Sequence, residues 1–306
     1  MEVGGGGLYA TTEDNLRLMK LYADGGVWNG ERILSSEYVA LATTTQNASA
    51  TESINNPDAT DNFLGYGYQI WMCKPKGAYR ADGAMGQFTI VVPDKDLIIA
   101  ITENASGAHW AQKSLNVIWD FVETVTVNAL PENPKAADSL SKRMAALALP
   151  APIFSPYLGY DTIKRISGTG YTITDGSLFF TEFGRMNFMS GETAADGVSS
   201  LRFLFQEEQC TIQYSRSGST GEILVACDGS LAQNELKSGV VSRALANGYW
   251  LDGRTFEMRI RWIETCTTRV YRFAFEDDTL RITVIGNGFM QPKEEIILGV
   301  AGPSVG

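Results

Sequence analysis

The chain has 306 residues, 44% of them hydrophobic and 20% charged, so it can build sizeable cores and is not disordered overall. That length corresponds to about two ordinary domains. Its formal charge of −10 would be repelled by phosphate backbones and anionic lipids, which makes nucleic acids and membrane surfaces poor partners. No apolar run reaches the roughly 18 residues that a membrane span needs.

Helix and strand signals alternate in the first 125 residues. Thr11 to Asp14 predicts a capped helix start, and Gly25-Gly26 predicts where that helix ends. The other elements predicted here are a short helix from Ser35 to about Ala42, a polar loop over 43–62, strands over 66–73, 87–92 and 97–102, and a helix over 108–122.

The middle of the chain has the composition of a linker. Residues 126–155 hold four prolines and a short helical pattern around Leu140–Leu149. Beyond them the periodicity changes to two, which predicts an all-β barrel, lipocalin-like barrel or sandwich. We therefore expect three parts, 1–125, 126–155 and 156–306. The strand-like runs lie at 170–174, 178–182, 201–206, 211–215, 223–226, 256–263, 270–275, 280–285 and 295–298.

Large aromatic side chains are frequent in the predicted β-domain and often share a strand face, as Phe203 and Phe205 do. At a period of two, such residues usually form the core. Small barrels can also hold one apolar ligand in the mouth, so a role in binding a small molecule stays open. The aromatic set is Tyr171, Phe179, Phe180, Phe183, Phe203, Phe205, Trp250, Trp262, Tyr271, Phe273 and Phe275.

The four cysteines, Cys73, Cys210, Cys227 and Cys266, lie far apart without a CxxC pair. We expect buried thiols, with a disulfide among the last three as the alternative. The single histidine, His109, lies in the first turn of a predicted helix, and no serine or cysteine motif supplies a partner for it. We expect a structural or surface histidine, no metal site and no cofactor.

Five short motifs follow one another in the first part. They are Gly5-Gly6-Gly7, Gly25-Gly26-Val27-Trp28-Asn29-Gly30, Tyr66-Gly67-Tyr68, Gly83-Ala84-Met85-Gly86-Gln87, and Pro93 with Lys95-Asp96-Leu97. Over about residues 4–125 this order resembles the C-terminal third of the catalytic domain of serine β-lactamase and penicillin-binding-protein-like hydrolases. The closest branch is that of class-C-like esterases and 6-aminohexanoate-dimer hydrolases.

The resemblance implies an α+β fold, in which a partial antiparallel sheet with flanking helices is followed by a C-terminal β-domain such as some relatives carry. It also implies a bacterial source, and it leaves the compartment open between cytoplasmic and extracytoplasmic. The chemistry it implies is covalent: a serine attacks a carbonyl, a lysine one helical turn later acts as its base, and a tyrosine shuttles the proton. Backbone N–H groups stabilise the oxyanion.

Only the last element of that machinery is present in this chain. Ala81-Asp82-Gly83 takes the strand-edge position, and Ala84 would offer an oxyanion N–H. The residues expected to line the substrate are Ala81, Asp82, Gly83, Met85, Gly86 and Gln87. Ala81 stands where the family has a cationic or imidazole residue. That departure favours an ester, amide or peptide substrate over a β-lactam.

The nucleophile is the element that the sequence does not supply. The one Ser-x-x-Lys, from Ser139 to Lys142, lies in the linker helix after the strand motif, where a solvated helix face is the better interpretation. Tyr-x-Asn and Gly-x-Ser-x-Gly motifs are missing from the sequence. We expect a hydrolase fragment that is inactive alone. The alternatives are a binding or assembly module centred on the β-domain, and a complete enzyme that uses Ser139 and Lys142.

A partner is expected at one strand. In the family, strands from the N-terminal half of the domain pair beside the position of Leu97–Thr102. Without them this apolar run becomes a free edge, which seeks another chain. We expect it to pair with a separately encoded N-terminal half or to make the chain an oligomer.

Overall fold

The computed structural model describes residues 8–47, 58, 60–83, 85–105, 110–148, 152–155, 159–182, 196–238, 241–265, 267–286 and 294–302. It divides into two compact units, Met1–Ser141 and Lys142–Gly306. The division falls inside the segment 126–155, and each unit has a hydrophobic core of its own.

The first helix, α1 (Thr12–Ala23), begins as its sequence predicts. The Thr11 hydroxyl accepts from the Asp14 N–H, and the Asp14 carboxylate accepts from the Thr11 N–H, which completes a capping box. Gly26 follows the helix with φ of +88°, where a Cβ would overlap the backbone of Leu34. The next elements are β1 (Val27–Trp28), β2 (Glu31–Arg32), α2 (Ser36–Ala42) and η1 (Thr60–Phe63).

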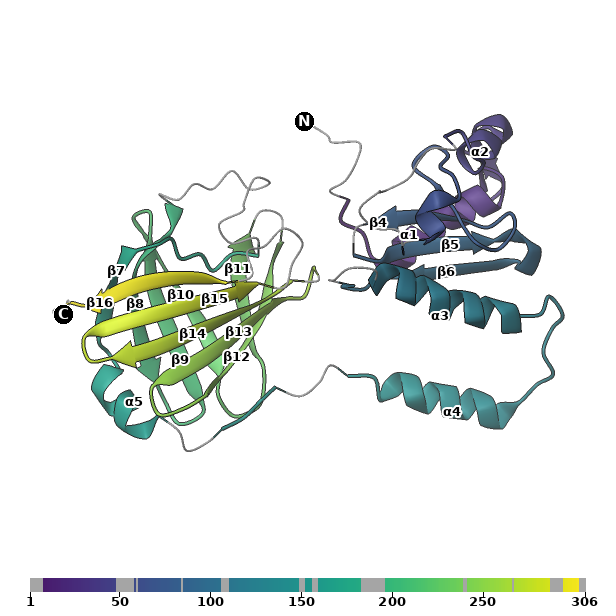
Figure 1. The fold of residues 1–306 in the computed structure, drawn as a ribbon. Helices are drawn as coiled ribbons and strands as arrows, with labels where there is room; N and C mark the ends of the chain where they lie inside the picture. The colour runs from purple at the N-terminus through teal and green to yellow at the C-terminus, as the bar shows by residue number, and fades with distance from the viewer. Residues whose placement is uncertain are drawn as a thin grey trace. The chain divides into compact units, whose positions relative to one another are not determined.

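Four strands form an antiparallel sheet in the order β3-β4-β5-β6. Side chains of β5 alternate between its faces: Phe88 and Ile90 pack with α3, whereas Val91 packs with Met19 of α1. The two helices therefore cover opposite faces of the sheet, which confirms the expected antiparallel sheet with flanking helices (Figure 1). The bounds are β3 (Trp71–Met72), β4 (Tyr79–Gly83), β5 (Gln87–Val92), η2 (Pro93–Lys95), β6 (Leu97–Ile101) and α3 (Trp110–Thr124).

The strand predicted over 66–73 is mostly a turn, and only Trp71–Met72 pairs as β3. Gln69 has φ of +62°, which interrupts an extended backbone. The Tyr68 N–H donates to the carbonyl of Ala42 instead of to a neighbouring strand. Of the alternating apolar residues, Ile70 and Met72 pack with Met19 of α1, whereas the Tyr68 ring lies 6.0 Å from that of Tyr38 on α2, between centres.

Several apolar surfaces of the first unit have no cover within the described residues. β6 pairs with β5 alone there, so its other edge has no strand partner. On the outer side of α3, Val117 and Phe121 are 68% and 54% exposed. A further helix, α4 (Pro134–Ala145), starts earlier than the predicted one and has no buried residue, although Leu140 and Met144 share one of its faces.

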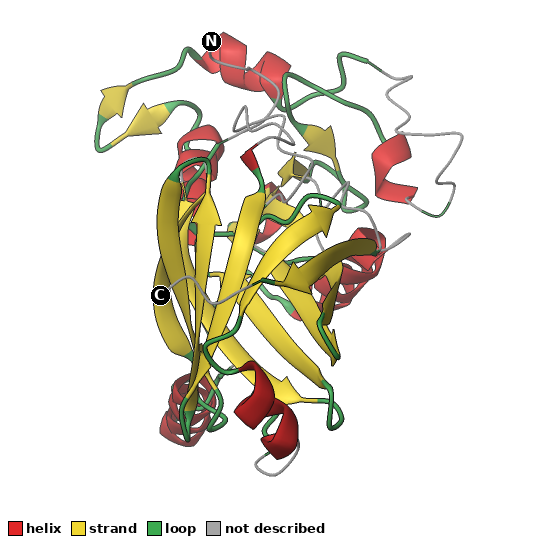
Figure 2. Cartoon of the chain, turned by 90° about the vertical axis from the view of Figure 1, so that its left-hand side faces the viewer, coloured by secondary structure: helices red, strands yellow, loops and turns green. Residues whose placement is uncertain are grey.

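The second unit is a closed barrel. After α5 (Tyr160–Ile166), ten strands form one sheet in the order β10-β9-β8-β7-β16-β15-β14-β13-β12-β11. Ala226 of β10 pairs with Asn247 of β12 and closes the ring (Figure 2). The strands are β7 (Gly170–Asp175), β8 (Val198–Phe205), β9 (Gln209–Arg216), β10 (Ser219–Ala226), β11 (Ala232–Ser238), β12 (Val241–Trp250), β13 (Thr255–Trp262), β14 (Thr268–Glu276), β15 (Thr279–Gly286) and β16 (Glu295–Ala301).

The period of two explains how the barrel fills. On β14, Tyr271, Phe273 and Phe275 are fully buried, while Arg272 and Glu276 between and beyond them are exposed. Tight hairpins connect the strands: Ser217 and Gly218, between β9 and β10, both have positive φ, as a type I′ turn requires. The expected all-β domain is confirmed as a barrel.

The predicted strand 178–182 is not a strand. Leu178 forms a single bridge with Val198, and the segment then runs buried at the barrel end, where the Phe179 carbonyl accepts from the Tyr271 hydroxyl at 2.8 Å. Strands β11 and β12 were not predicted. Ala244, Ala246 and Gly248 on the inward face of β12 lack the bulk by which strands are recognised.

Candidate functional site

The hairpin between β4 and β5 carries the residues that the sequence assigns to substrate contact. Gly83 and Gln87 form the last pair of the two strands, and the Gly86 N–H donates to the Gly83 carbonyl at 3.2 Å. Met85 and Gly86 both have positive φ. The hairpin therefore turns at one end of the sheet. Ala84, the candidate oxyanion donor, lies outside the described residues.

Glu103, which follows β6, contacts the hairpin at Gly86 and Gln87. A Cβ on Gly86 would overlap the Glu103 carboxylate, so only glycine fits beside it. The Gln87 side-chain amide donates to the Glu103 carbonyl at 2.7 Å, and the Ser114 hydroxyl donates to Glu103 Oε2 at 2.9 Å. These bonds tie the turn to the end of β6 and to α3, which fixes its position.

Ala81 and Asp82, which precede Gly83 on β4, lie in different surroundings. Asp82 accepts from Arg80 Nε at 2.8 Å and leaves 20% of its side chain exposed. Arg80 is fully buried, with its guanidinium carbon 5.7 Å from the centres of the Trp71 and Phe88 rings. Ala81 packs against the cluster under α1. Asp82 therefore balances the charge of the buried Arg80. Part of the Asp82 side chain is still exposed.

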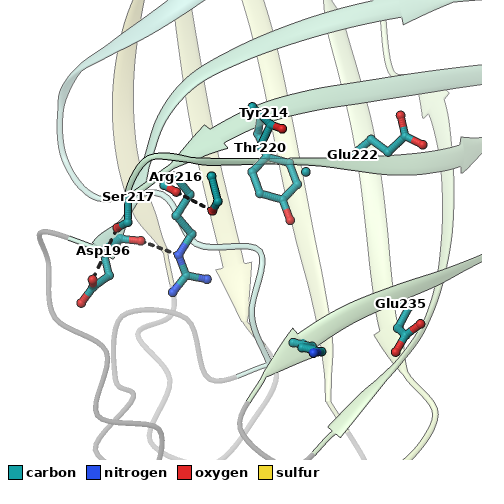
Figure 3. Close-up of a pocket in the computed structure, with 10 residues that line it drawn as sticks. Asp196, Tyr214, Arg216, Ser217, Thr220, Glu222 and Glu235 are labelled. Atoms are coloured by element: carbon teal, nitrogen blue, oxygen red, sulfur yellow. Dashed lines mark hydrogen bonds between the residues drawn. The ribbon is translucent and has the colours of Figure 1, made fainter.

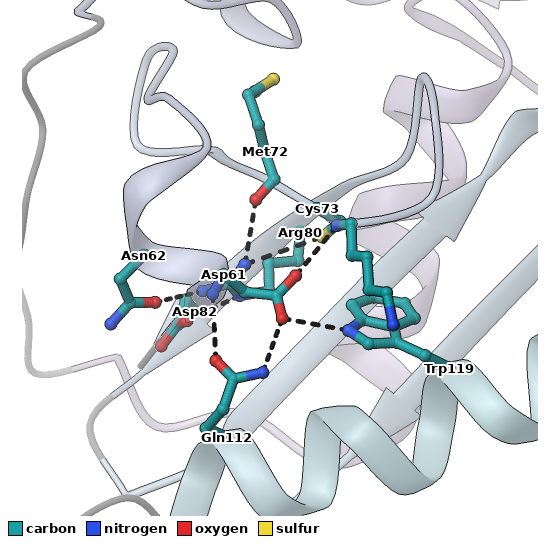
Figure 4. A network of polar contacts seen from close by, with 9 residues as sticks. Asp61, Asn62, Met72, Cys73, Arg80, Asp82, Gln112 and Trp119 are labelled. Carbon is teal, nitrogen blue, oxygen red and sulfur yellow. Dashed lines mark hydrogen bonds and ion pairs between the residues drawn. The ribbon is translucent and has the colours of Figure 1, made fainter. Parts of the chain in front are cut away.

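A buried carboxylate, Asp61, anchors the loop before the sheet (Figure 4). Asp61 of η1 is 1% exposed and accepts from Trp119 Nε1 at 3.1 Å and from the Gln112 amide at 2.6 Å. It also accepts from the Lys74 N–H at 2.9 Å. Because its oxygens already have these donors, Asp61 holds η1, the β3–β4 turn and α3 together and has no free position for substrate. The sequence does not single out Asp61 or Arg80, since the segment around Asp61 has only the composition of a polar loop.

The other candidate catalytic groups do not assemble into a site. Ser139 and Lys142 lie on α4, which buries none of its residues. His109 lies outside the described residues, as does Cys266.

The described cysteines are free thiols. Burial raises the pKa of Cys73 to about 12 and that of Cys227 to about 12, and it raises the pKa of Cys210 well above its ordinary value. The thiolate is the reactive form, so these thiols are structural. In the described part of the chain, no group of three or more His, Cys, Asp or Glu side chains could hold a metal ion. None of the helices there has the length and hydropathy of a membrane span.

The barrel aromatics pack on one another. The Phe203 ring lies 5.0 Å from Phe273 and 5.1 Å from Phe275, and Tyr171 lies 5.8 Å from Phe275, between ring centres. Trp250 and Phe256 continue this cluster toward α5. These rings are core, as their periodicity favours. Phe183 lies outside the described residues.

A hollow of about 660 Å³ opens at the other end of the barrel, lined by β9, β10 and β11 (Figure 3). Hydroxyls and both signs of charge line it, including Tyr214, Arg216, Glu222, Glu235 and Lys237. Arg216 Nε donates to the Asp196 carbonyl at 2.6 Å, which fixes the rim. Ligand sites in proteins have this size, so the hollow is a candidate binding site.

Comparisons with known proteins separate the two units. The Beta-lactamase family model matches residues 1–119 of the 306, which is well under half of the chain. No curated protein matches the sequence significantly.

Among solved structures, the barrel is similar to a fatty acid-binding protein from the brain of Drosophila melanogaster, with 16% identity and a TM-score of 0.34, over 44% of this chain and 99% of that one. A fatty-acid-binding protein from Manduca sexta has 10% identity and a TM-score of 0.34, over 44% and 99%. Secretory abundant heat soluble protein 4 from Ramazzottius varieornatus has 14% identity and a TM-score of 0.36, over 49% and 100%. At these values the three proteins say nothing about what this barrel binds. The chain thus joins a segment that matches the Beta-lactamase family model, residues 1–119, to a C-terminal β-barrel.

Proposed function

We propose that the first unit supplies the oxyanion wall of an acyl-transfer site of the serine β-lactamase-like kind, and that the attacking serine belongs to a segment outside residues 1–306. The chain alone is then inert. The observation that carries this proposal is the β4–β5 hairpin, whose turn at the sheet end is tied to the Glu103 carbonyl by the Gln87 side-chain amide. Rigid, outward backbone N–H groups are what an oxyanion requires, because they stabilise developing charge without rearranging.

The substrate class follows from Ala81. A carboxylate on the substrate would need a cation at this strand edge, and an alanine packed under α1 offers none. Arg80, the nearest cation in the sequence, is buried and held by Asp82 and by the Asn62 side chain, at 2.6 Å from its oxygen. An ester, amide or peptide carbonyl without a neighbouring carboxylate is therefore the favoured substrate.

The test is covalent labelling. The chain alone should gain no mass from a fluorophosphonate or a fluorescent penicillin, whereas a form that includes the segment with Ser-x-x-Lys and Tyr-x-Asn should be labelled on that serine. Ala84→Pro removes the N–H and should slow labelling of that form about 10²- to 10³-fold, while the matched control Ala84→Ser keeps it. A mass shift on Ser139 of the chain alone would overturn the proposal.

We also propose that the free edge of β6 pairs with a strand of another chain or segment. An apolar strand with one unpaired edge is a template for another strand. The exposed Val117 and Phe121 on α3 add apolar area to this unit that a partner can bury. Pairing with the N-terminal half or with a second copy would cover these surfaces.

A second function is proposed for the barrel, because the hollow at its β9–β11 end has the volume of a ligand site. Its hydroxyls and mixed charges favour a small polar molecule. The amphipathic anion 8-anilinonaphthalene-1-sulfonate is a usable probe. Thr220→Trp, at the rim of the hollow, should lower its fluorescence, and Thr279→Trp, exposed in the β14–β15 hairpin outside the hollow, should not. Equal fluorescence in both variants would place the dye elsewhere and contradict the proposal.

A further inference from the structure

The barrel wall is not paired between β10 and β11. The ring closes where Ala226 of β10 pairs with Asn247 of β12, and in the described part of the chain β11 pairs with β12 alone. The facing edges of β10 and β11 therefore have no strand partner there, and the hollow of about 660 Å³ lies between them (Figure 3). An unpaired strand edge presents a row of main-chain donors and acceptors.

One side chain of β11 indicates which chemical group fits this gap. The Asn234 side-chain oxygen accepts from the Leu224 N–H at 2.8 Å, and the Asn234 side-chain nitrogen donates to the Leu224 carbonyl at 2.9 Å. A peptide group also carries one donor and one acceptor, and strands pair through such bonds. The edge of β10 is therefore matched to amide groups, and Asn234 occupies only its first position.

The main-chain groups that come next on both edges face the hollow. The main chain of Leu224 faces β11, and main-chain groups alternate between the two sides of a strand, so those of Glu222 face β11 as well. On β11, Glu235 lies opposite Arg243 of β12, whose carbonyl accepts from the Ile263 N–H at 3.1 Å on the side of β13. Glu235 and Arg243 are therefore not a hydrogen-bonded pair, and the main chain of Glu235 faces β10.

The side chains at the gap give it a charge and a floor. Glu222, Glu235 and Lys237 are exposed, so two carboxylates and one ammonium group line the outer side. On the inner side, the Tyr214 ring of β9 lies so close to Gly221 that a Cβ on this glycine would overlap it. A chain in the gap would therefore lie over an aromatic ring and under a net negative charge.

We propose that the hollow binds a peptide in an extended conformation, paired with the main-chain groups that face the gap and carrying a basic side chain toward Glu222 and Glu235. The inference rests on the ligand-binding function proposed for the barrel and names the chemical class of its ligand. The peptide is either short and free or a segment of a longer chain. Both sources use the same contacts, because main-chain pairing supplies affinity and alternate side chains supply specificity.

Calorimetric titration of the full chain tests this with the pentapeptide Thr-Val-Lys-Val-Thr, blocked at both ends. Two further versions are methylated on alternate backbone nitrogens, which removes the donors on one side or the other. At least one of these should bind about tenfold or more weakly, because it loses main-chain hydrogen bonds. Glutamate in place of the lysine should also weaken binding. Equal binding of all four peptides overturns the inference.

Two comparisons complete the titration. Tighter binding of the pentapeptide with free ends indicates a short free peptide, and equal or weaker binding indicates a segment of a longer chain. If 8-anilinonaphthalene-1-sulfonate binds in the hollow and no peptide does, the inference fails and the ligand-binding function stands. If neither binds, both fail.

Variants of β10 locate the pairing. Glu222→Pro removes an N–H that faces the gap and takes no part in the ladder with β9, so the strand should still form. It should weaken binding of the blocked pentapeptide at least about tenfold. Glu222→Gln keeps the N–H and is the matched control, with a loss of only a few-fold. If circular dichroism shows that Glu222→Pro does not fold, Thr220→Pro, two residues earlier on the same edge, carries the test. Unchanged binding in a folded proline variant overturns the proposed pairing.

Discussion

The two units of this chain differ in how completely they bury their apolar surface. The barrel closes on itself, and its central aromatics Phe203 and Phe273 are fully buried. The sheet of the first unit ends at β6 with one edge unpaired among the described residues, and α3 exposes Val117 and Phe121. A barrel has no free edge, whereas an open sheet needs a neighbour on each side. The barrel therefore pairs its strands all round, whereas the described part of the first unit leaves one edge of β6 without a strand partner.

The strongest test of this contrast compares two phenylalanines. Phe273→Ala in the barrel core should reduce the free energy of unfolding by about 3–5 kcal/mol, because it leaves a cavity among packed rings. Phe121→Ala, on the exposed side of α3, should change it by no more than about 0.5 kcal/mol in the chain alone. Urea unfolding followed by circular dichroism measures both. Equal losses would mean that α3 is already covered.

The buried anchor of the first unit gives the next largest effect. Asp61→Ala removes the acceptor for Gln112, Trp119 and the Lys74 N–H, and should cost about 3 kcal/mol of unfolding free energy. Asp120→Ala, on the exposed side of α3, is the control and should be nearly neutral. A neutral Asp61→Ala would show that this network does not hold the unit together.

The open edge predicts association. Light scattering at low salt should show the chain as an oligomer, and Ile99→Lys in β6 should shift it toward the monomer, because a charge on an edge strand opposes pairing. Leu140→Lys on α4 serves as the matched control and should leave the mass unchanged. A monodisperse monomer of the unmodified chain would count against the proposed edge pairing.

The smallest expected effects concern two barrel glutamates of opposite behaviour. Burial would raise the pKa of Glu257, but hydrogen bonds from Arg272, Tyr249 and Arg259 hold it below its ordinary value. Its contribution to stability is present above the unfolded-state pKa of about 4.3 and is lost as the pH falls through the lowered folded-state pKa.

Burial raises the pKa of Glu182, so its contribution is full below the unfolded-state pKa and is lost as the pH rises through the raised folded-state pKa. Melting temperatures at pH 4 and pH 7 measure both. Glu257→Gln should destabilise more at pH 7 than at pH 4, whereas Glu182→Gln should stabilise at pH 7 relative to pH 4. The same sign for both variants would contradict these environments.

The sequence predicts this fold where local rules decide it. The capping box at Thr11 and the alternation along β14 are local, and both are confirmed. The sequence does not predict the β12 strand, because its inward residues Ala244, Ala246 and Gly248 are small. They suit large neighbours such as Trp262, which pairs with Ala244. The segment 178–182 alternates like a strand but is buried at the barrel end by long-range contacts such as that of Tyr271.

The residues of the candidate site also differ in whether the sequence alone indicates them. In the Gly83–Gln87 motif, Gly86 could be expected at the turn, because its φ of +93° is one that glycine adopts readily. Arg80 could not be singled out, since an arginine in a strand is expected at the surface, and only the fold places it between the Trp71 and Phe88 rings. Asp61 could not be singled out either. It lies in a polar loop, and the residues that donate hydrogen bonds to it are 13 to 58 positions away in the sequence.

A crystal structure of the phosphonylated hydrolase, with the segment that carries the attacking serine, would test the oxyanion wall most directly. We predict one phosphoryl oxygen at about 2.7–3.1 Å from the Ala84 nitrogen, at the end of the β4–β5 hairpin. A phosphonate bound to Ser139, or one whose oxygens lie away from this hairpin, would contradict the account.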